Sequence, residues 1–187
     1  MGNTSKKYVA LLRGINVGGN RKVSMSELKK MFEKLGFQSV ITYINSGNIL
    51  FIDERDPAQI QSIITKSLES TFFLSIPVHI ITFEALKNIL SVVPDLWTND
   101  KEQKTDVIFL NDKVDSKDIL NKIVINAEIE NVIYQKGALI WNIDRAHAKQ
   151  GNSVQLVSSK LYKDMTIRNI NTVRKLYSLL EERPVAS

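Results

Sequence analysis

The chain has 187 residues, of which 43% are apolar, enough to build the hydrophobic core of one domain or two small ones. It contains no cysteine, which excludes disulfide bonds, thiolate catalysis and sulfur-dependent zinc sites. No apolar run reaches about 18 residues and the first seven residues are polar, so we expect neither membrane spanning nor export. We therefore expect a cytoplasmic protein.

The net charge of +5 is unevenly distributed along the chain. Residues 1–34 carry eight Lys or Arg against two acidic residues, 35–144 carry nine against fifteen, and 145–187 carry eight against three. If the two ends of the chain meet in space, they form a basic face that attracts phosphates or polyanions. The alternative is that these charges simply lie on solvated helix faces.

Apolar runs bounded by turn residues, and two capped helices with apolar stripes, predict the order βαββαβ for the first half. The predicted elements are a strand over 8–12, a helix from a Ser24 cap to Gly36, strands over 40–44 and 49–52, a helix that begins at Asp56-Pro57, and a strand over 78–81. In a split βαβ unit the first and third strands are antiparallel neighbours. The loop after the first strand and the turn between the second and third strands should therefore converge at one end of the sheet.

The sequence of the second half predicts a short helix capped by Thr82, followed by elements in the order βαββαα. The predicted elements are a linker over 93–104, a strand over 106–110, a helix over 116–123, a hairpin of 132–134 with 139–143, and two final helices. Both halves share the order βαββα, which suggests a structural duplication. We expect an α+β fold of two ferredoxin-like (βαββαβ-type) subdomains, residues 1–95 and 96–187, packed together.

A loop rich in Gly and Asn follows the first strand and precedes a capped helix. Its candidate ligand-binding residues are Arg13, Gly14, Asn16, Gly18, Gly19 and Asn20. Glycines let backbone N–H groups approach an anion, and the helix N-terminus adds partial positive charge. The spacing matches neither GxGxxG nor the P-loop. The alternative is that the glycines merely take positive φ in a tight connection while the Asn side chains bond the local backbone.

The turn between the two middle strands of the first half supplies the candidates Asn45, Ser46, Gly47 and Asn48. An ordinary hairpin accounts for this composition. The turn becomes a candidate site only through its expected nearness to the Gly/Asn-rich loop.

Further candidates lie in the second half. Arg168 and Asn169 precede the final helix; Thr166 or Asn169 could cap it, and Arg168 could reach an anion. His147, in a polar loop, is a candidate proton shuttle, whereas His79 lies within a predicted strand. The two histidines are separated and lack clustered acids, so we expect no metal site and infer no cofactor.

Three segments carry a family resemblance: Val9–Asn20, Tyr43–Asn48 and Thr166–Thr172. Together they resemble the bacterial domain-of-unknown-function family 1697 over nearly the whole chain. The resemblance implies a small bacterial α+β protein built from related subdomains, with no assigned reaction, cofactor or partner. One departure is Ile170, where an aromatic residue is expected after the Arg-Asn pair, so a stacking role is not expected at that position.

The leading functional hypothesis is a binding module for an anionic ligand, either a phosphorylated small molecule or nucleic acid. Nucleic acid is the less favoured ligand because aromatic residues do not alternate with the basic ones. One alternative is an enzyme acting on a phosphorylated or carboxylated metabolite, with His147 as acid or base and Arg13 as anion clamp. Another is a structural or oligomer-forming protein whose loops serve packing alone.

Overall fold

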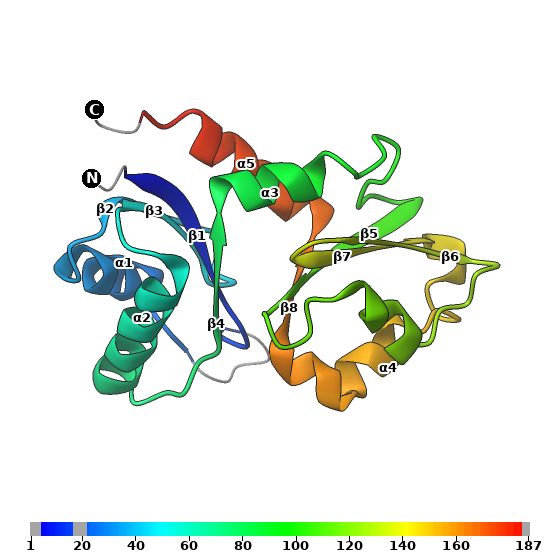
Figure 1. Ribbon diagram of the computed structural model, residues 1–187, viewed down its shortest axis with the longest axis horizontal. Coiled ribbons are helices and arrows are strands. Elements are labelled where there is room, and N and C mark those ends of the chain that lie inside the picture. Colours follow the sequence, from blue (N-terminus) through cyan, green and yellow to red (C-terminus); the bar gives the residue numbers. More distant parts are fainter. Residues whose placement is uncertain (1–4, 17–21, 185–187) are drawn as a thin grey trace. The chain divides into compact units, whose positions relative to one another are not determined.

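The computed structural model describes residues 5–16 and 22–184. The chain forms two compact units, one made of Met1–Glu84 with Leu176–Ser187 and the other of Ala85–Lys175. Each unit contains one four-stranded antiparallel sheet with helices (Figure 1). The expected α+β fold of two similar subdomains is therefore confirmed.

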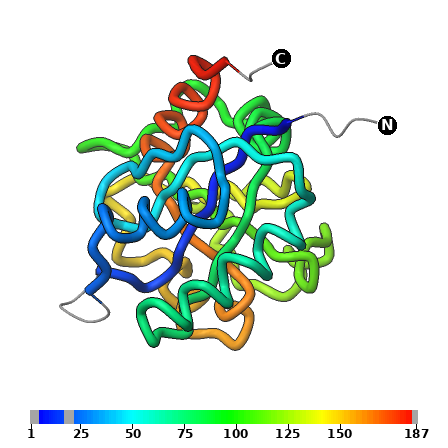
Figure 2. The backbone as a smooth tube through the Cα atoms, turned by 90° about the vertical axis from the view of Figure 1, so that its left-hand side faces the viewer, coloured from blue at the N-terminus to red at the C-terminus, as the bar shows by residue number. Residues whose placement is uncertain are grey.

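The first unit follows the predicted order βαββαβ. Its elements are β1 (Lys6–Leu12), α1 (Met25–Lys34), β2 (Gln38–Tyr43), β3 (Asn48–Asp53), α2 (Pro57–Phe72) and β4 (Val78–Thr82), followed directly by α3 (Phe83–Leu90). The strand order is β2-β3-β1-β4, and all neighbours are antiparallel. β1, drawn in blue, therefore crosses the middle of this sheet between β3 and β4 (Figure 1 and Figure 2).

Capping residues fix where the two helices of this unit begin. The Ser24 hydroxyl accepts the N–H of Glu27 at the start of α1. At the start of α2, Asp56 and Gln59 form a reciprocal capping box and Pro57 occupies the first turn. The apolar sides of both helices pack against one face of the sheet, in a core that includes Tyr8, Ala10, Leu12, Leu28, Phe32, Phe51, Ile60, Ile64 and Leu68.

β1 is buried on both faces. Alternate residues point to opposite sides of a strand, so Val9 and Leu11 lie on the face away from α1 and α2. These two side chains are only 1% and 0% exposed. At these positions the sheet offers no exposed stacking surface of the kind that single-stranded nucleic acids use.

The second unit repeats the same sheet topology, with strand order β6-β7-β5-β8. This unit includes most of α3, and α5 begins in it and continues into the first unit. Its elements after α3 are β5 (Gln103–Leu110), the 3₁₀ helix η1 (Lys117–Lys122), β6 (Glu130–Gln135), β7 (Ala138–Asp144), η2 (Arg145–His147), α4 (Ser153–Ser158), η3 (Lys160–Asp164), β8 (Met165–Asn169) and α5 (Ile170–Glu181). The predicted order βαββαα is thus corrected, because a fourth strand, β8, lies between the last two helices. The predicted helix over 116–123 is a 3₁₀ helix.

The segment 93–104, predicted as a linker, belongs to the second unit. Within it, the N–H of Trp97 donates to the carbonyl of Pro94 at 2.9 Å and closes a turn. The carboxylate of Asp100 accepts the N–H of Gln103, the first residue of β5, at 2.9 Å. The segment is therefore a hydrogen-bonded approach to β5.

The two units pair their strands at corresponding positions. Leu12 and Leu110, the last residues of β1 and β5, pair with Val78 and Met165 in the corresponding edge strands. Both edge strands are followed without a gap by a helix, β4 by α3 and β8 by α5. The order βαββαβ followed by a helix thus occurs twice along the chain, which gives the proposed duplication a structural basis.

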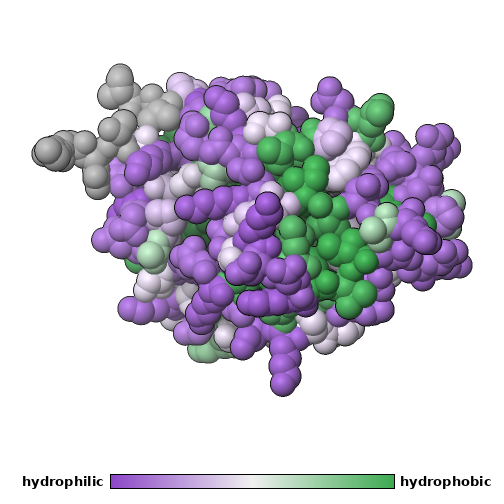
Figure 3. All heavy atoms as spheres, turned by 45° about the vertical axis from the view of Figure 1, so that its right-hand side comes forward, coloured by the Kyte–Doolittle hydropathy of each residue, from purple (hydrophilic) through white to green (hydrophobic). Residues whose placement is uncertain are grey.

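Hydrophilic residues cover most of the face seen in Figure 3, and apolar side chains gather on it in one continuous band. Among the described residues, the large apolar side chains that are clearly exposed are Ile44, Phe73, Leu96, Val124, Val154 and Val157. Phe73 and Leu96 stand out, at 88% and 84% exposed. No helix within residues 5–16 and 22–184 has the length and hydropathy needed to span a bilayer.

Candidate functional site

The loop after β1 and the β2–β3 turn meet at one end of the first sheet, as the topology predicted. The N–H of Leu12 donates to the carbonyl of Gly47 at 2.8 Å. The side-chain amide of Asn16 donates to the carbonyl of Asn45 at 3.0 Å. Arg13 is half-buried, and its N–H donates to the carbonyl of Pro77, which precedes β4, at 3.0 Å. Three connections of the chain thus converge at this end.

Asn16 closes the Gly/Asn-rich loop on itself. Its side-chain oxygen accepts the N–H of Val23 at 2.8 Å, and its side-chain nitrogen donates to the carbonyl of the same residue at 2.9 Å. The backbone of Asn16 has φ 55°, in the left-handed region that Asn tolerates better than most residues. The candidates Gly18, Gly19 and Asn20 lie outside the described residues.

The turn residues Gly47 and Asn48 have structural roles at this end. Gly47 has φ 77°, and a Cβ there would lie 2.8 Å from Cβ of Leu12 and 2.9 Å from Cδ1 of Ile15, so only glycine fits. Asn48 is fully buried and donates from its amide to the carbonyl of Tyr43 and to the hydroxyl of Ser46, both at 3.0 Å. The Asn48 bonds fix the shape of the turn, and the close approach of Gly47 to Leu12 and Ile15 sets the turn against the loop.

A pocket of about 410 Å³ opens where the loop meets the start of α1. Its lining residues are Asn16, Lys22, Val23, Ser24, Met25 and Asn45. Lys22 and Asn45 are exposed, whereas Val23 is buried and Met25 half-buried, so polar groups surround an apolar base. The N-terminus of α1 adds partial positive charge. Gly14, with φ 72°, is exposed in the same loop.

Arg168 and Asn169, the remaining candidates, belong to β8 in the second unit. Asn169 is a cap, because its side-chain oxygen accepts the N–H of Thr172 at 2.8 Å. The alternative cap Thr166 is wrong, because this residue is buried within β8. The guanidinium of Arg168 donates to the carbonyl of Ile167 at 2.8 Å, and burial lowers the pKa of Arg168 to about 10. His147 is exposed in η2 of the same unit.

In the second unit, the loop after the first strand and the hairpin turn are both shorter than the corresponding loop and turn of the first unit. The N–H of Leu110 donates to the carbonyl of Gly137 at 2.9 Å, which repeats the bond between Leu12 and Gly47. Only residues 111–115 separate β5 from Ser116, the cap of η1, whereas 13–23 separate β1 from the cap of α1. The hairpin turn is likewise shorter, with residues 136–137 in place of 44–47.

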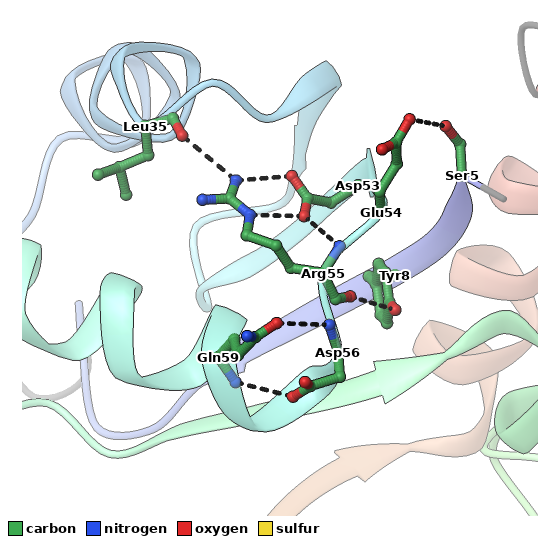
Figure 4. Close-up of polar contacts among 8 residues, drawn as sticks. All are labelled: Ser5, Tyr8, Leu35, Asp53, Glu54, Arg55, Asp56 and Gln59. Atoms are coloured by element: carbon green, nitrogen blue, oxygen red, sulfur yellow. Dashed lines mark hydrogen bonds and ion pairs between the residues drawn. The ribbon is translucent and has the colours of Figure 1, made fainter. Parts of the chain in front are cut away.

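Sequence reasoning missed a polar cluster at the far end of β3. The guanidinium of Arg55 forms a two-pronged ion pair with the carboxylate of Asp53, at 2.7 and 2.6 Å (Figure 4). Arg55 also donates to the carbonyl of Leu35 beyond α1 at 3.3 Å, and its own carbonyl accepts the Tyr8 hydroxyl at 2.8 Å. Burial alone would raise the pKa of Asp53, but the hydrogen bonds and charge of Arg55 lower it overall. The cluster joins β1, β3 and α1, so we interpret it as structural.

A buried carboxylate, Glu130, lies at the start of β6 in the second unit and is 3% exposed. It accepts the indole N–H of Trp141 at 3.1 Å and the backbone N–H groups of Asn126 and Asn152 at 2.8 and 2.6 Å. These donors tie two loops to the sheet, which again indicates a structural role. Within the described part of the chain, no three His, Asp or Glu side chains are grouped so that they could hold a metal ion.

Comparison with known proteins supports the fold and the family. No curated protein matches this sequence. A solved structure of the conserved bacterial protein SP0830 from Streptococcus pneumoniae is similar, with a TM-score of 0.82 and 26% identity over 95% of this chain and 99% of that one. The family model described as "Protein of unknown function (DUF1697)" matches residues 5–141, most of the chain. The loop, the turn and the two duplicated sheets described above thus lie in a chain that belongs to the DUF1697 family.

Proposed function

We propose that the first unit binds a small anionic ligand, such as a phosphorylated metabolite, in the pocket between Asn16, Lys22 and Asn45. The observation that carries the proposal is the contrast between the two units. The second unit builds the same sheet end from residues 111–115 and a two-residue turn. The longer loop and turn of the first unit are therefore not required by this topology, and loops held on a rigid scaffold commonly carry binding sites.

The chemistry of the pocket supports an anion. Lys22 places an exposed ammonium beside the N-terminus of α1, where backbone N–H groups and the helix dipole favour negative charge. Asn45 adds an exposed side-chain amide, which can donate a hydrogen bond. Asn16 is a positioning residue, because its amide already bonds Val23 and Asn45. A volume of about 410 Å³ suits a small metabolite.

The test is thermal shift and calorimetry with inorganic phosphate, sugar phosphates, nucleotides and short carboxylates. A ligand that binds the folded state raises the melting temperature by mass action. Lys22→Ala should weaken the affinity about tenfold or more, because a charge-assisted hydrogen bond contributes about 1.5–3 kcal/mol. The matched control is Lys113→Ala, which removes the same charge from the shorter loop of the second unit and should leave the affinity unchanged.

Two outcomes would contradict the proposal: no anion stabilises the wild type, or Lys22→Ala and Lys113→Ala weaken binding equally. Stabilisation by any oligonucleotide, with affinity falling steeply as salt rises, would instead support nucleic acid as the ligand. Turnover of a bound metabolite would support the alternative of an enzyme.

A further inference from the structure

A groove of about 310 Å³ lies between α1 and α2, and it is separate from the proposed anion pocket. Its lining residues are Glu27, Lys30, Met31, Lys34, Leu35, Ser67, Thr71 and Phe72. Met31, Leu35 and Phe72 make it partly apolar. On the exposed side of α1, Lys29 pairs with Glu33 at 3.7 Å. Within the described residues Lys30 and Lys34 form no ion pair, and the groove has two ammonium groups against the one carboxylate of Glu27, which leaves it with a net positive charge.

Phe73, the residue after α2, has a backbone conformation that is unfavourable for its side chain. Its backbone is left-handed, with φ 56° and ψ 31°, at a helix C-terminus where glycine is the usual residue. Its side chain is 88% exposed and so gains little from burial. A bulky residue at positive φ is uncommon, and such outliers concentrate at functional sites. Phe73 follows directly on Phe72, which lines the groove.

A matching convex feature exists elsewhere on the same chain. The hydrogen bond between Trp97 and Pro94 closes a turn whose two corner residues are Asp95 and Leu96. Both are exposed, Leu96 to 84%. The turn thus presents one apolar side chain next to one carboxylate, and the groove presents an apolar surface next to two ammonium groups and the carboxylate of Glu27. The net charges of the two surfaces are therefore opposite.

We infer that the groove between α1 and α2, together with Phe73 at the end of α2, binds the Pro94–Trp97 turn of a second copy of this chain. Phe73 and Leu96, the apolar side chains on the two sides of this proposed contact, are each largely exposed. One groove and one turn bury much less than the roughly 1,200 Å² of a stable interface. The association is therefore reversible, depends on concentration, and weakens as salt screens the charges.

Sedimentation velocity over micromolar to millimolar concentrations tests the inference. The average sedimentation coefficient of the wild type should rise with concentration, more at low salt. Leu96→Ser should abolish the rise, and Val124→Ser, which also removes an exposed apolar side chain, should not. Phe73→Gly should weaken association yet raise the melting temperature, because glycine adopts positive φ without strain. A gain in stability rules out misfolding as the cause.

Charge reversal identifies the two surfaces. Asp95→Lys alone and Lys30→Glu with Lys34→Glu should each lose association, because each protein then carries matching charges on turn and groove. An equimolar mixture should regain it, because every turn then has an oppositely charged groove available. A wild type that stays monomeric throughout would overturn the inference. A mixture that fails to associate would also overturn it, and would leave another protein or a membrane surface as the occupant to consider.

Discussion

Asn16 holds the candidate site together through a single side-chain amide. That amide bonds both the N–H and the carbonyl of Val23 and also reaches Asn45. Asn16→Gly keeps the left-handed backbone and removes the amide, so we expect the free energy of unfolding to fall by about 1–3 kcal/mol. Asn16→Ala should cost about 1 kcal/mol more, because alanine is strained at φ 55°. Urea unfolding of both variants measures the two effects. If the free energy of unfolding of Asn16→Gly equals that of the wild type, the amide contributes nothing to stability.

At the scale of secondary structure elements, the Asp53–Arg55 pair links the ends of β3 and α1 and makes stability depend on pH. The pKa of Asp53 is lowered in the folded state, so folding favours the ionised carboxylate. Its contribution is complete above the ordinary value of 3.8 and is lost as the pH falls below that value. The melting temperature of wild type should therefore exceed that of Asp53→Asn at neutral pH, and the difference should shrink in strong acid. Asp112→Asn, at an exposed position, is the control; an equal effect there would contradict this account.

The elements that the sequence predicted correctly are those marked by a regular apolar pattern or by helix-capping residues. Apolar runs and caps such as Asp56 gave the order of the first unit, and the topology then predicted that Asn16 and Asn45 would lie close together. β8 was missed because Thr166 and Arg168 interrupt its apolar pattern and resemble residues that precede a helix. The alternative that the Asn side chains bond the local backbone anticipated the kind of bond that Asn16 makes but not its partner Val23. That partner and the bond of Arg55 to Asp53 left no periodic signal, because they depend on how loops close in three dimensions.

At the scale of the whole molecule, the duplication supplies an internal control for the proposed site. Replacing residues 17–22 with Gly-Ser-Gly should preserve folding, because Ile15 and Val23 remain to fill the core and Asn16 remains to join the loop ends. The same change should remove the thermal shift caused by the anion, because Lys22 is lost. Replacing residues 112–114 with the same linker should leave that shift intact. A shortened loop that still responds to the anion would place binding elsewhere.

The first unit is made of two separate segments of the chain, and this affects the order in which the two units fold during synthesis. Leu176 and Leu180 are buried, the Lys7 ammonium donates to the carbonyl of Glu181, and Arg183 donates to the carbonyl of Ser39. The first unit therefore needs residues that leave the ribosome after the second unit, residues 85–175, has been made without interruption. Domains generally fold as they emerge, the N-terminal one first. Here the unit that is begun first is completed last, so a chain that ends at residue 175 and has been released from the ribosome should resist proteolysis in its second unit but not in its first.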